Sequence, residues 1–427
     1  MNILIVGGGG REHAILKSIK KSPLCGKIYC LPGNGGIACE AECVDISTKD
    51  IKAITTFAIE KKIDFAIVAP DDPLVLGAVD ELEKVGISCF GPNKAAAIIE
   101  GSKAFSKSLM QKYNIPTADY QTFDNADKAI QYILNNNVFP IVIKADGLAL
   151  GKGVIIAENF EEAKNAVESI MLDKAFGDSG NKIVVEEFLT GPEVSVLSFT
   201  DGKAIIPMVS SMDHKRALDD DKGLNTGGMG TIAPNPYYTK SIADECMKSI
   251  FIPTMNAMNS EGRAFKGCLY FGLMLTEKGP KVIEYNCRFG DPETQVVLPL
   301  LESDLLEIMI AVSKERLSET KVTFKDGAAC CVIIASGGYP QDYKKGKKIS
   351  FDGIVESGNI LIYHAGTKKA ENGDILTSGG RVLGVTATGK DLTEAIKNAY
   401  EQTDKITFEG SFYRHDIGRK ALNYIRK

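Results

Sequence analysis

The chain of 427 residues contains no tryptophan, only four histidines, and no C-x-x-C pair among its ten cysteines. These gaps argue against structural zinc, which is held by cysteine and histidine at close, regular spacings. Several cysteines lie in apolar stretches such as residues 329–334, where a free thiol behaves as a small hydrophobic side chain. Reduced thiols of this kind predict a cytoplasmic protein.

An excess of positive charge and long apolar runs are also missing. Fifty basic residues stand against 55 acidic ones, a net charge of −5, so no broad basic field predicts binding to a nucleic-acid backbone. No apolar run reaches the roughly 18 residues of a membrane span, and the first ten residues have no basic, signal-like region. We therefore expect neither nucleic acid nor a membrane as a partner.

Glycine, in contrast, is abundant: 42 residues, where average usage is roughly 7%. In the first hundred residues, short apolar segments alternate with helical ones, and this alternation predicts a parallel sheet covered on both faces. Ligands of such sheets bind beyond the carboxyl ends of the strands. The expected strands are residues 2–6, 27–31, 65–69 and 88–91, and the expected helices are residues 11–20, 51–61 and 74–84.

Four consecutive glycines, residues 7–10, follow the first expected strand. The dinucleotide fingerprint G-x-G-x-x-G fails here, because Glu12 or His13 stands where the third glycine is needed, and the second strand ends in Pro32 instead of an acidic residue. We therefore expect no nicotinamide or flavin. The glycines instead predict a phosphate cradle at a helix N-terminus, with a tight turn that binds nothing as the alternative.

A lysine-ended strand and a glycine-rich hairpin follow in the second hundred residues. Residues 139–144 read as a buried strand that ends at Lys144, and residues 145–156 form a hairpin that can fold over an anion. It is not a Walker A loop, because Gly147 and Gly151 are one residue too close and Gly153 follows Lys152.

Two further polar segments leave alternatives open. Glu186 and Glu187 directly follow the expected strand 183–185 and are either solvated charges or part of a site. Residues 213–216, Asp-His-Lys-Arg, stand near the glycine loop 225–230 and form either an anion clamp or a mobile surface loop. The four histidines are expected at loop edges, and no pair has ligand-like spacing: His13, His214, His364 and His415.

The strongest candidate site lies on the second strand of an expected hairpin, residues 271–276 and 281–285. Alternation along a strand puts Glu284 and Asn286 on one face, two oxygen ligands side by side. Magnesium is typically held by one or two such ligands together with substrate phosphates. Arg288 stands two residues further along the same face, where it can pair with phosphate or carboxylate.

In this order, the sequence motifs resemble those of the ATP-grasp ligases, and among them the phosphoribosylamine-glycine ligase family of purine biosynthesis. The resemblance spans essentially the whole chain. Around Asp71, however, the chain reads Ala-Pro-Asp-Asp-Pro-Leu where the family usually has G-P-E-x-P-L. The longest matching motifs are GGREHA near the start, IEGSKAF at 99–105, IVIKADGLALGKGV at 141–154, EEFLTGPE at 186–193, NTGGMG at 225–230 and EYNCRFGDPET at 284–294.

The resemblance implies a multi-domain mixed α/β protein with an ATP-grasp fold. Residues 1–101 would form an N-terminal parallel α/β substrate domain, and residues 102–190 a small ATP-grasp subdomain with a linker helix and a glycine-rich lid. Residues 191–326 would form the large ATP-grasp subdomain with the metal site. Residues 327–427 would form a strand-rich C-terminal domain.

The implied reaction joins glycine to 5-phosphoribosylamine through glycyl phosphate, giving glycinamide ribonucleotide, ADP and phosphate. ATP would be a substrate with Mg²⁺ or Mn²⁺, the partners would be small molecules only, and the protein would be a monomer. Two alternatives stay open: an ATP-grasp ligase for another amino acid or ribonucleotide, and a non-catalytic ATP-binding module.

The resemblance also implies roles for individual residues. Glu284 and Asn286 would hold the metal. Three side chains would act in catalysis: Arg288, Asp213 and Lys144. The ATP site would consist of Lys103, Lys144, Gly147, Gly151, Lys152, Gly153, Glu186, Glu187, Phe188, Leu189 and Glu193. The other substrates would contact Gly8, Gly9, Gly10, Asn34, Asp71, Asp213 and Arg288.

Overall fold

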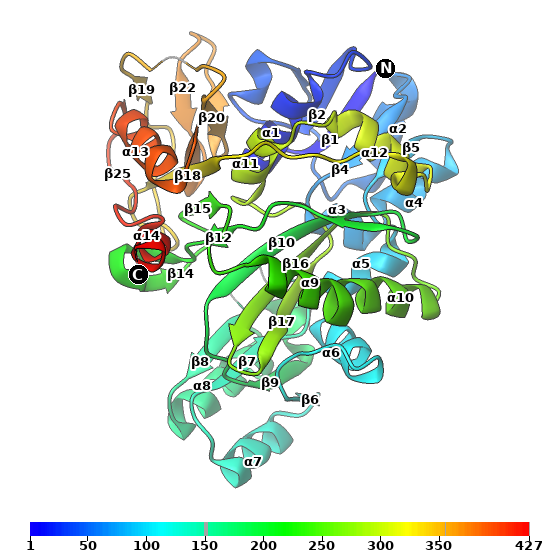
Figure 1. Ribbon diagram of the computed structural model, residues 1–427, viewed down its shortest axis with the longest axis vertical. Helices are drawn as coiled ribbons and strands as arrows, with labels where there is room; N and C mark the ends of the chain where they lie inside the picture. The colour runs from blue at the N-terminus through cyan, green and yellow to red at the C-terminus, as the bar shows by residue number, and fades with distance from the viewer. Residues whose placement is uncertain (149–152, 355, 427) are drawn as a thin grey trace.

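In the computed structural model, which describes residues 1–148, 153–354 and 356–426, the chain folds around several separate sheets (Figure 1). The N-terminal segment lies beside the strand-rich C-terminal segment. A lobe built from β6 to β9 projects away from both, below the central strands β10, β16 and β17. The mixed α/β class and the multi-domain organisation expected from the sequence are confirmed.

The first hundred residues form the parallel sheet that the sequence predicts. Strand order is β3-β2-β1-β4-β5, every pair is parallel, and β1 is buried along its whole length. Its carboxyl edge carries the loops at Gly7–Gly10, 33–36 and 69–73. The elements are β1 (Ile3–Gly7), α1 (Gly10–Ile19), β2 (Ile28–Pro32), β3 (Glu42–Cys43), α2 (Ile51–Glu60), β4 (Phe65–Val68), α3 (Asp71–Leu76), α4 (Ala78–Lys84), β5 (Ser88–Phe90) and α5 (Lys94–Gly101).

One helix prediction in this segment was wrong. The segment 74–84 was expected as a single helix, but α3 ends at Leu76 and α4 begins at Ala78. The break falls at Gly77, whose φ of +96° is left-handed and accessible to glycine at little cost. The break also lets helix α3 begin at Asp71, so that this carboxylate stands in the first turn of α3.

The projecting lobe is a four-stranded antiparallel sheet of order β6-β9-β7-β8, in which α7 packs against α8 and β6, and α8 packs against β7 and β8. Asparagine side chains begin both helices, Asn125 and Asn159 accepting N–H bonds from the third residue beyond each. The lobe, with α6 (Lys103–Lys112) leading into it, consists of β6 (Tyr120–Phe123), α7 (Ala126–Asn136), β7 (Ile141–Ala145), β8 (Val154–Ala157), α8 (Phe160–Met171) and β9 (Ile183–Glu187).

The central sheet, of order β11-β10-β16-β17, lies between this lobe and the N-terminal segment (Figure 1). The hairpin expected around residues 277–280 is confirmed as β16 and β17, longer than predicted. The elements are β10 (Glu193–Thr200), β11 (Ile205–Pro207), α9 (Lys240–Cys246), α10 (Ile252–Ser260), β16 (Gly267–Thr276), β17 (Gly279–Asn286), α11 (Thr294–Val297) and α12 (Leu305–Ser313).

The last hundred residues are rich in strands, as expected, but their main sheet has members from an earlier part of the chain. Its order is β12-β15-β18-β23-β20, and β25 pairs with β18. The earlier members are β12 (Met212–Asp213) and β15 (Gly230–Ala233); the others are β18 (Ala328–Ser336), β20 (Ile360–His364), β23 (Arg381–Gly389) and β25 (Ser411–Phe412). The remaining elements are β13 (Arg216–Leu218), β14 (Lys222–Asn225), β19 (Ser350–Phe351), β21 (Thr367–Lys369), β22 (Ile375–Thr377), α13 (Leu392–Thr403), β24 (Ile406–Thr407) and α14 (Arg419–Ile425).

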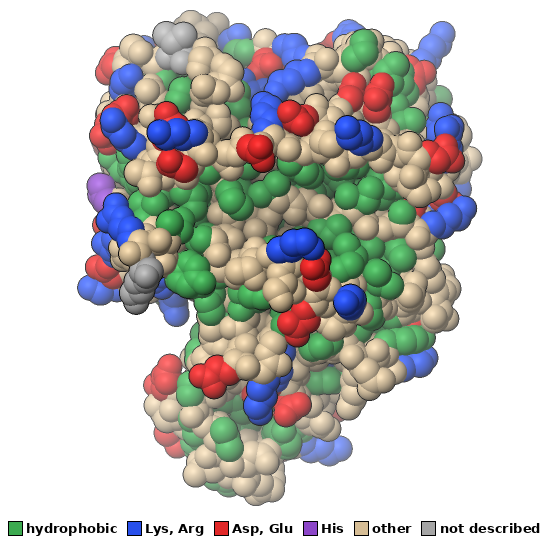
Figure 2. All heavy atoms as spheres, viewed as in Figure 1, with side chains coloured by type: hydrophobic (Ala, Val, Ile, Leu, Met, Phe, Trp, Pro, Cys, Tyr) green, Lys and Arg blue, Asp and Glu red, His purple; other side chains and the backbone are tan. Residues whose placement is uncertain are grey.

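The surface agrees with the charge balance of the sequence. On the face shown in Figure 2, Lys and Arg side chains are interspersed with Asp and Glu, and no extended patch of one sign is visible. Within residues 1–148, 153–354 and 356–426, no helix is both long and apolar enough to cross a membrane.

The break between α3 and α4 can be tested with Gly77→Ala. A Cβ there would meet only atoms at ordinary contact distances of 3.5 Å or more, so the left-handed φ is the main source of strain. We expect the free energy of unfolding to fall by about 1–2 kcal/mol, measured by urea titration with far-UV circular dichroism. Gly358→Ala is the control, because its φ is not left-handed and nothing lies within 4 Å of an added Cβ. An equal loss in both variants would contradict the argument.

Candidate functional site

Two lysines mark the junction between the projecting lobe and the central sheet. Lys144, on β7, donates to the carbonyl oxygen of Ile283 on β17 at 3.1 Å. Lys103, the first residue of α6, donates to the carbonyl oxygen of Gly147 at 2.9 Å. Both lysines lie close enough to Glu284 to lower its pKa. The expected anion-binding lysines are therefore brought together on one side of the candidate metal ligands.

Asp146, which the sequence analysis did not single out, fastens the glycine-rich hairpin to α6. Its carboxylate accepts the N–H of Ala104 at 2.7 Å and the hydroxyl of Ser102 at 3.0 Å. Gly147 lies so close to Ser179 that a Cβ would come within 2.5 Å of its Oγ. Gly153 lies at the other end of the hairpin, directly before β8, and its carbonyl oxygen accepts the N–H of Ala145 at 2.8 Å. Gly151 and Lys152 lie outside the described residues.

The two adjacent carboxylates at the end of β9 have opposite environments. Glu186 is only 4% exposed, and its Oε2 accepts from Lys144 at 3.0 Å and from Lys107 at 2.9 Å. Its Oε1 is buried and has no hydrogen-bond partner among the described residues. Glu187 is exposed and pairs with Lys281. Solvated charge therefore describes Glu187, whereas Glu186 belongs to a buried ionic cluster.

The remaining residues expected at the nucleotide line the same edge. Phe188 is exposed and Leu189 is half-buried, directly after β9. Glu193 begins β10, and its carboxylate pairs with the ammonium of Lys215 at 3.0 Å. These three residues lie in or beside the segment that connects β9 of the lobe to β10 of the central sheet. A ligand bound between the lobe and the central sheet would therefore contact this segment.

Glu284 and Asn286 share one face of β17, as the alternation predicts, and both are half-buried. Their carboxylate and amide oxygens are hard donors that suit Mg²⁺ or Mn²⁺, with phosphate and water completing the coordination. No group of three or more His, Cys, Asp or Glu that could hold a metal occurs in the described parts of the chain. The donor set therefore fits a metal that is held jointly with a substrate.

The electrostatic surroundings of Glu284 favour its charged form. Burial alone would raise its pKa, yet the pKa lies below the ordinary value. Four cationic side chains outweigh burial: Lys215, Lys144, Lys103 and Arg288. Without a metal, these cations would attract any anion that approaches Glu284, so the site combines a carboxylate ligand with a positively charged rim.

Arg288 follows β17 and is held by groups that the sequence analysis missed. Its guanidinium pairs with Glu100 at 3.1 Å and donates to Oδ1 of Asn286 at 3.3 Å. Glu100, at the end of α5, is buried and also accepts the N–H of Cys287 at 2.7 Å. The IEGSKAF motif contained Glu100, but nothing in its local pattern indicated a partner nearly 190 residues away.

Asp213 and Lys215 line the other side of the site. Burial and the neighbouring carboxylate of Glu293 raise the pKa of Asp213 well above its ordinary value. Glu293 is buried and accepts from the hydroxyl of Ser195 at 3.3 Å. Gly228, with φ +108°, lies against Asp213, where a Cβ would stand 2.6 Å from Oδ1. Asp213 and Lys215 therefore lie beside the candidate metal ligands, whereas Arg216 donates to the carbonyl oxygen of Gly223.

The N-terminal loops that carry the expected substrate residues contact the segment that follows Arg288. Gly8 lies against the 33–36 loop, where a Cβ would come within 2.2 Å of the carbonyl oxygen of Gly33. The N–H of Gly9 donates to Glu12 at 2.6 Å. Gly10 lies against Gln295, so the glycine run also meets the segment that follows Arg288. These glycines therefore permit close approach of three chain segments.

Asn34 and Asp71 stand in these loops in different ways. The Asn34 amide donates to the carbonyl oxygens of Gly8 and His364, at 2.9 and 2.7 Å, and its Oδ1 accepts the N–H groups of Gly36 and Ile37. Its side chain thus shapes the loops. Burial would raise the pKa of Asp71, but the positive charges of Arg288 and Arg11 hold it below its ordinary value.

The expectation that all four histidines lie at loop edges was wrong for His13, which lies inside α1. His214 follows β12 at a loop edge, as expected, but both rings are buried, at 2% and 6% exposure. Each ring is accommodated by hydrogen bonds: His13 accepts the N–H of His364 at 2.8 Å, and His214 lies 3.2 Å from the carbonyl oxygen of Gly230.

The site combines paired lysines at the junction of two sheets, a glycine-rich hairpin, and a strand whose carboxylate and amide can hold a metal. Together these features are typical of an ATP-grasp enzyme. Solved structures agree: the biotin carboxylase domain of Hydrogenobacter thermophilus 2-oxoglutarate carboxylase, in complex with MgADP, shares the fold with a TM-score of 0.75 at 16% identity, over 96% of this chain and 91% of that one. Enzymes of this class use ATP as a substrate together with a divalent cation.

The chain belongs to the phosphoribosylglycinamide synthetase family. The family's N domain matches residues 1–100, its ATP-grasp (A) domain residues 101–294, and its C domain residues 329–420. The phosphoribosylamine-glycine ligase of Caldanaerobacter subterraneus subsp. tengcongensis is 49% identical over 417 residues, 98% of this chain and 99% of that protein. The crystal structure of the Thermotoga maritima phosphoribosylamine-glycine ligase superimposes with a TM-score of 0.86 at 32% identity, covering 98% of this chain and 100% of that one.

The buried cluster at the end of β9 can be tested by neutralising each carboxylate in turn. Glu186→Gln leaves Lys144 and Lys107 buried without a counter-charge, and we expect the free energy of unfolding to fall by about 3–5 kcal/mol. Glu187→Gln, at the adjacent exposed position, should cost less than about 1 kcal/mol. Urea titration followed by circular dichroism measures both, and similar losses in the two variants would show that Glu186 is not the buried partner of the lysines.

Proposed function

We propose that this protein catalyses the ATP-dependent joining of glycine to 5-phosphoribosylamine, giving glycinamide ribonucleotide, ADP and phosphate. The observation that carries the proposal is the ring of cations around Glu284 and Asn286, in a chain whose full length matches phosphoribosylamine-glycine ligases. The placement of cations beside two oxygen ligands is what a reaction between anions requires.

In the first step, a carboxylate oxygen of glycine attacks the γ-phosphorus of ATP. An O–P bond forms, the bond to the β-phosphate oxygen breaks, and glycyl phosphate and ADP result. Carboxylate and triphosphate repel each other, so positioning and charge compensation dominate the catalysis. Lys144 and Lys103 would contact the phosphates from the lobe, and Arg288 would contact the transferring group from the end of β17.

Glu284 and Asn286 would hold Mg²⁺ or Mn²⁺, either of which their oxygen donors suit. When bound, the ion offsets the negative charge of the phosphates. The half-buried position of Glu284 and its lowered pKa support this role, because the carboxylate stays ionised and keeps its oxygens available. Asn286 is oriented by the guanidinium of Arg288.

The nucleoside of ATP would lie against the connection between β9 and β10. Glu186, Glu187, Phe188 and Leu189 would line the adenine, with Glu193 at the ribose. Glu186 has one buried oxygen without a partner, which supports a polar ligand group nearby. The hairpin that contains Gly147, Gly151, Lys152 and Gly153 would cover the phosphates and exclude water from the acyl phosphate.

Asp213 and Arg288 would bind the ammonium and carboxylate groups of glycine. The amine of phosphoribosylamine then attacks the acyl carbon, the new C–N bond replaces the C–O bond to phosphate, and the amine loses a proton. Gly8, Gly9 and Gly10 with Asn34 and Asp71 would bind the phosphoribosylamine. A helix N-terminus in a glycine loop supports phosphate binding there. We further propose a monomer that acts in the cytoplasm.

The reaction is tested by supplying protein, Mg²⁺ and ATP with freshly prepared phosphoribosylamine and one amino acid at a time. We expect ADP release only in the complete mixture with glycine. Equal turnover with alanine would favour a ligase for another amino acid. Tight ATP binding without ADP release under any combination would favour a non-catalytic module. Replacing Mg²⁺ by Mn²⁺ in the same assay compares the two ions.

The metal ligand is tested with Glu284→Ala, which should lower the rate of ADP release at least about 100-fold, in the range lost when charge stabilisation of a transition state is removed. The matched control is Glu277→Ala, an exposed carboxylate at the turn of the same hairpin, which should keep wild-type activity. Circular dichroism checks that both variants remain folded, and full activity of folded Glu284→Ala would refute the metal assignment.

A further inference from the structure

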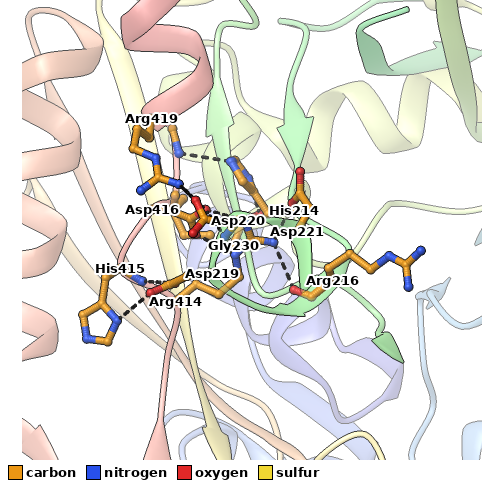
Figure 3. A network of polar contacts seen from close by, with 12 residues as sticks. His214, Arg216, Asp219, Asp220, Asp221, Gly230, Arg414, His415, Asp416 and Arg419 are labelled. Carbon is orange, nitrogen blue, oxygen red and sulfur yellow. Dashed lines mark hydrogen bonds and ion pairs between the residues drawn. The ribbon is translucent and has the colours of Figure 1, made fainter. Parts of the chain in front are cut away.

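The C-terminal tail, residues 414–420, contacts the segment 213–216, which runs from the end of β12 to the start of β13 and carries Asp213 and Lys215. The buried ring of His214 lies between the two (Figure 3). Its Nδ1 is 3.2 Å from the carbonyl oxygen of Gly230, and its Nε2 is 3.1 Å from the backbone nitrogen of Gly418. Because a carbonyl can only accept and an N–H can only donate, Nδ1 carries the proton and Nε2 accepts. The ring is therefore neutral, and burial lowers its pKa to about 4.

A buried arginine anchors the same tail to the hairpin that follows His214. Arg414 is 1% exposed and makes two parallel hydrogen bonds of 2.8 Å to the carboxylate of Asp416. Its Nη1 donates to the carbonyl oxygen of Arg216 at 3.0 Å and pairs with Asp221 at 2.9 Å. Figure 3 shows these groups converging from the β13–β14 hairpin and the tail. A planar guanidinium fork is suited to hold such an arrangement in one geometry.

Exposed contacts surround this buried centre. His415 donates its backbone N–H to Asp219 at 2.8 Å, Arg419 pairs with Asp220, and Lys420 pairs with Asp221. The Arg419 and Asp220 side chains are both more than half exposed. Surface pairs of this kind contribute little, so the buried Arg414 and His214 carry the attachment.

The contacts between the tail and His214 lie on the opposite face of the extended segment 213–215 from the candidate site. Because side chains alternate along an extended chain, His214 points one way while Asp213 and Lys215 point the other. Lys215 reaches Glu193 at 3.0 Å and Glu284 at 3.8 Å. Its carbonyl oxygen also accepts the N–H and hydroxyl of Thr226, at 2.8 Å each, which fixes the start of the glycine loop 226–230.

We propose that His214 and Arg414 are positioning residues, through which the C-terminal tail holds Asp213, Lys215 and the 226–230 loop in register for the amino-acid substrate. The inference rests on the proposed function. Hereafter the His214 and Arg414 contacts are called the tail latch. The latch acts directly on the amino-acid side of the site, whereas Lys103, Lys144 and Glu186 lie on other elements. Its link to the ATP side is the pair of Lys215 with Glu193.

Two substitutions at His214 separate the two hydrogen bonds of the ring. His214→Asn retains a donor near the Nδ1 position and loses the acceptor for Gly418, whereas His214→Gln places an acceptor near the Nε2 position. We expect His214→Asn to raise KM for glycine about tenfold or more, because a misplacement of about 1 Å can cost about 100-fold in such sites. The Kd for ATP should change much less than KM for glycine, because among the described residues only the pair of Lys215 with Glu193 links these residues to the expected ATP site. His214→Gln should restore KM to within about threefold of wild type.

The matched arginine pair is Arg414→Met and Arg419→Ala. Arg414→Met should reproduce the glycine effect of His214→Asn. Arg419→Ala removes a half-exposed side chain that pairs with Asp220 and makes only a long contact of 3.4 Å with Asp416, so it should stay close to wild type. Amide hydrogen exchange by mass spectrometry gives a readout independent of turnover: residues 215–230 should exchange faster in His214→Asn and Arg414→Met, with the lobe unchanged.

The outcomes separate the latch from the proposed reaction. A glycine-specific rise in KM together with faster exchange of residues 215–230 supports the latch. Unchanged kinetics in folded His214→Asn, or equal losses in the glycine and ATP parameters that His214→Gln does not rescue, overturn it. If the wild-type protein releases no ADP with glycine, the proposed function fails, while unchanged exchange of residues 215–230 in both variants would separately refute the latch.

Discussion

A buried cation requires a nearby carboxylate, and this requirement organises the site. Removing a charge from water costs several kcal/mol unless an opposite charge and hydrogen bonds replace the lost solvation. Lys144 and Lys107 share one oxygen of Glu186, and Arg288 is paired with Glu100. Each pair joins elements from different parts of the chain, so the positive rim around Glu284 exists only when those parts are assembled.

The same pairing explains how a protein of net charge −5 can present a cationic site. The cations are not in excess over the whole chain; they are concentrated by carboxylates that stand behind them. Arg381 of β23 is a further example: it donates to the carbonyl oxygens of Gly227 and Asp291, at 2.6 and 2.8 Å, and lies 3.4 Å from the Asp291 carboxylate. The C-terminal segment thereby reaches the glycine loop and the segment after Arg288 simultaneously.

The sequence predicted what depends on local periodicity and failed where partners are distant. Alternation placed Glu284 and Asn286 on one face of a strand, and apolar segments located β1, β2, β4 and β5 to within two residues. Alternation says nothing about which carboxylate meets a given cation, so Glu100, Lys107 and Glu293 were missed. The family resemblance implied a substrate role for Asn34. In the structure, its amide donates to the main-chain carbonyl oxygens of Gly8 and His364.

The burial of His13 and His214 was missed for a related reason. A neutral imidazole needs one donor and one acceptor at fixed positions. For His214 both are backbone atoms of other segments, whereas His13 accepts the N–H of His364 and lies 3.2 Å from the carboxylate of Glu40. The residues beside His214 in sequence are charged because they face the site, on the other side of the strand. A polar local sequence therefore gives no sign that the ring lies in the interior.

The glycine-rich loops depend on side chains from remote parts of the chain. Glycine lets the backbone approach a ligand or another backbone, as at Gly8 and Gly228, but a glycine-rich loop loses the most conformational entropy on folding. Such a loop needs fixing from outside. The 226–230 loop is held by Arg381, by the hydroxyl of Tyr339 on the N–H of Gly227 at 3.1 Å, and by the carbonyl oxygen of Lys215. Since Lys215 is itself held through its neighbour His214, the order of the loop depends on a tail nearly 200 residues away in the chain.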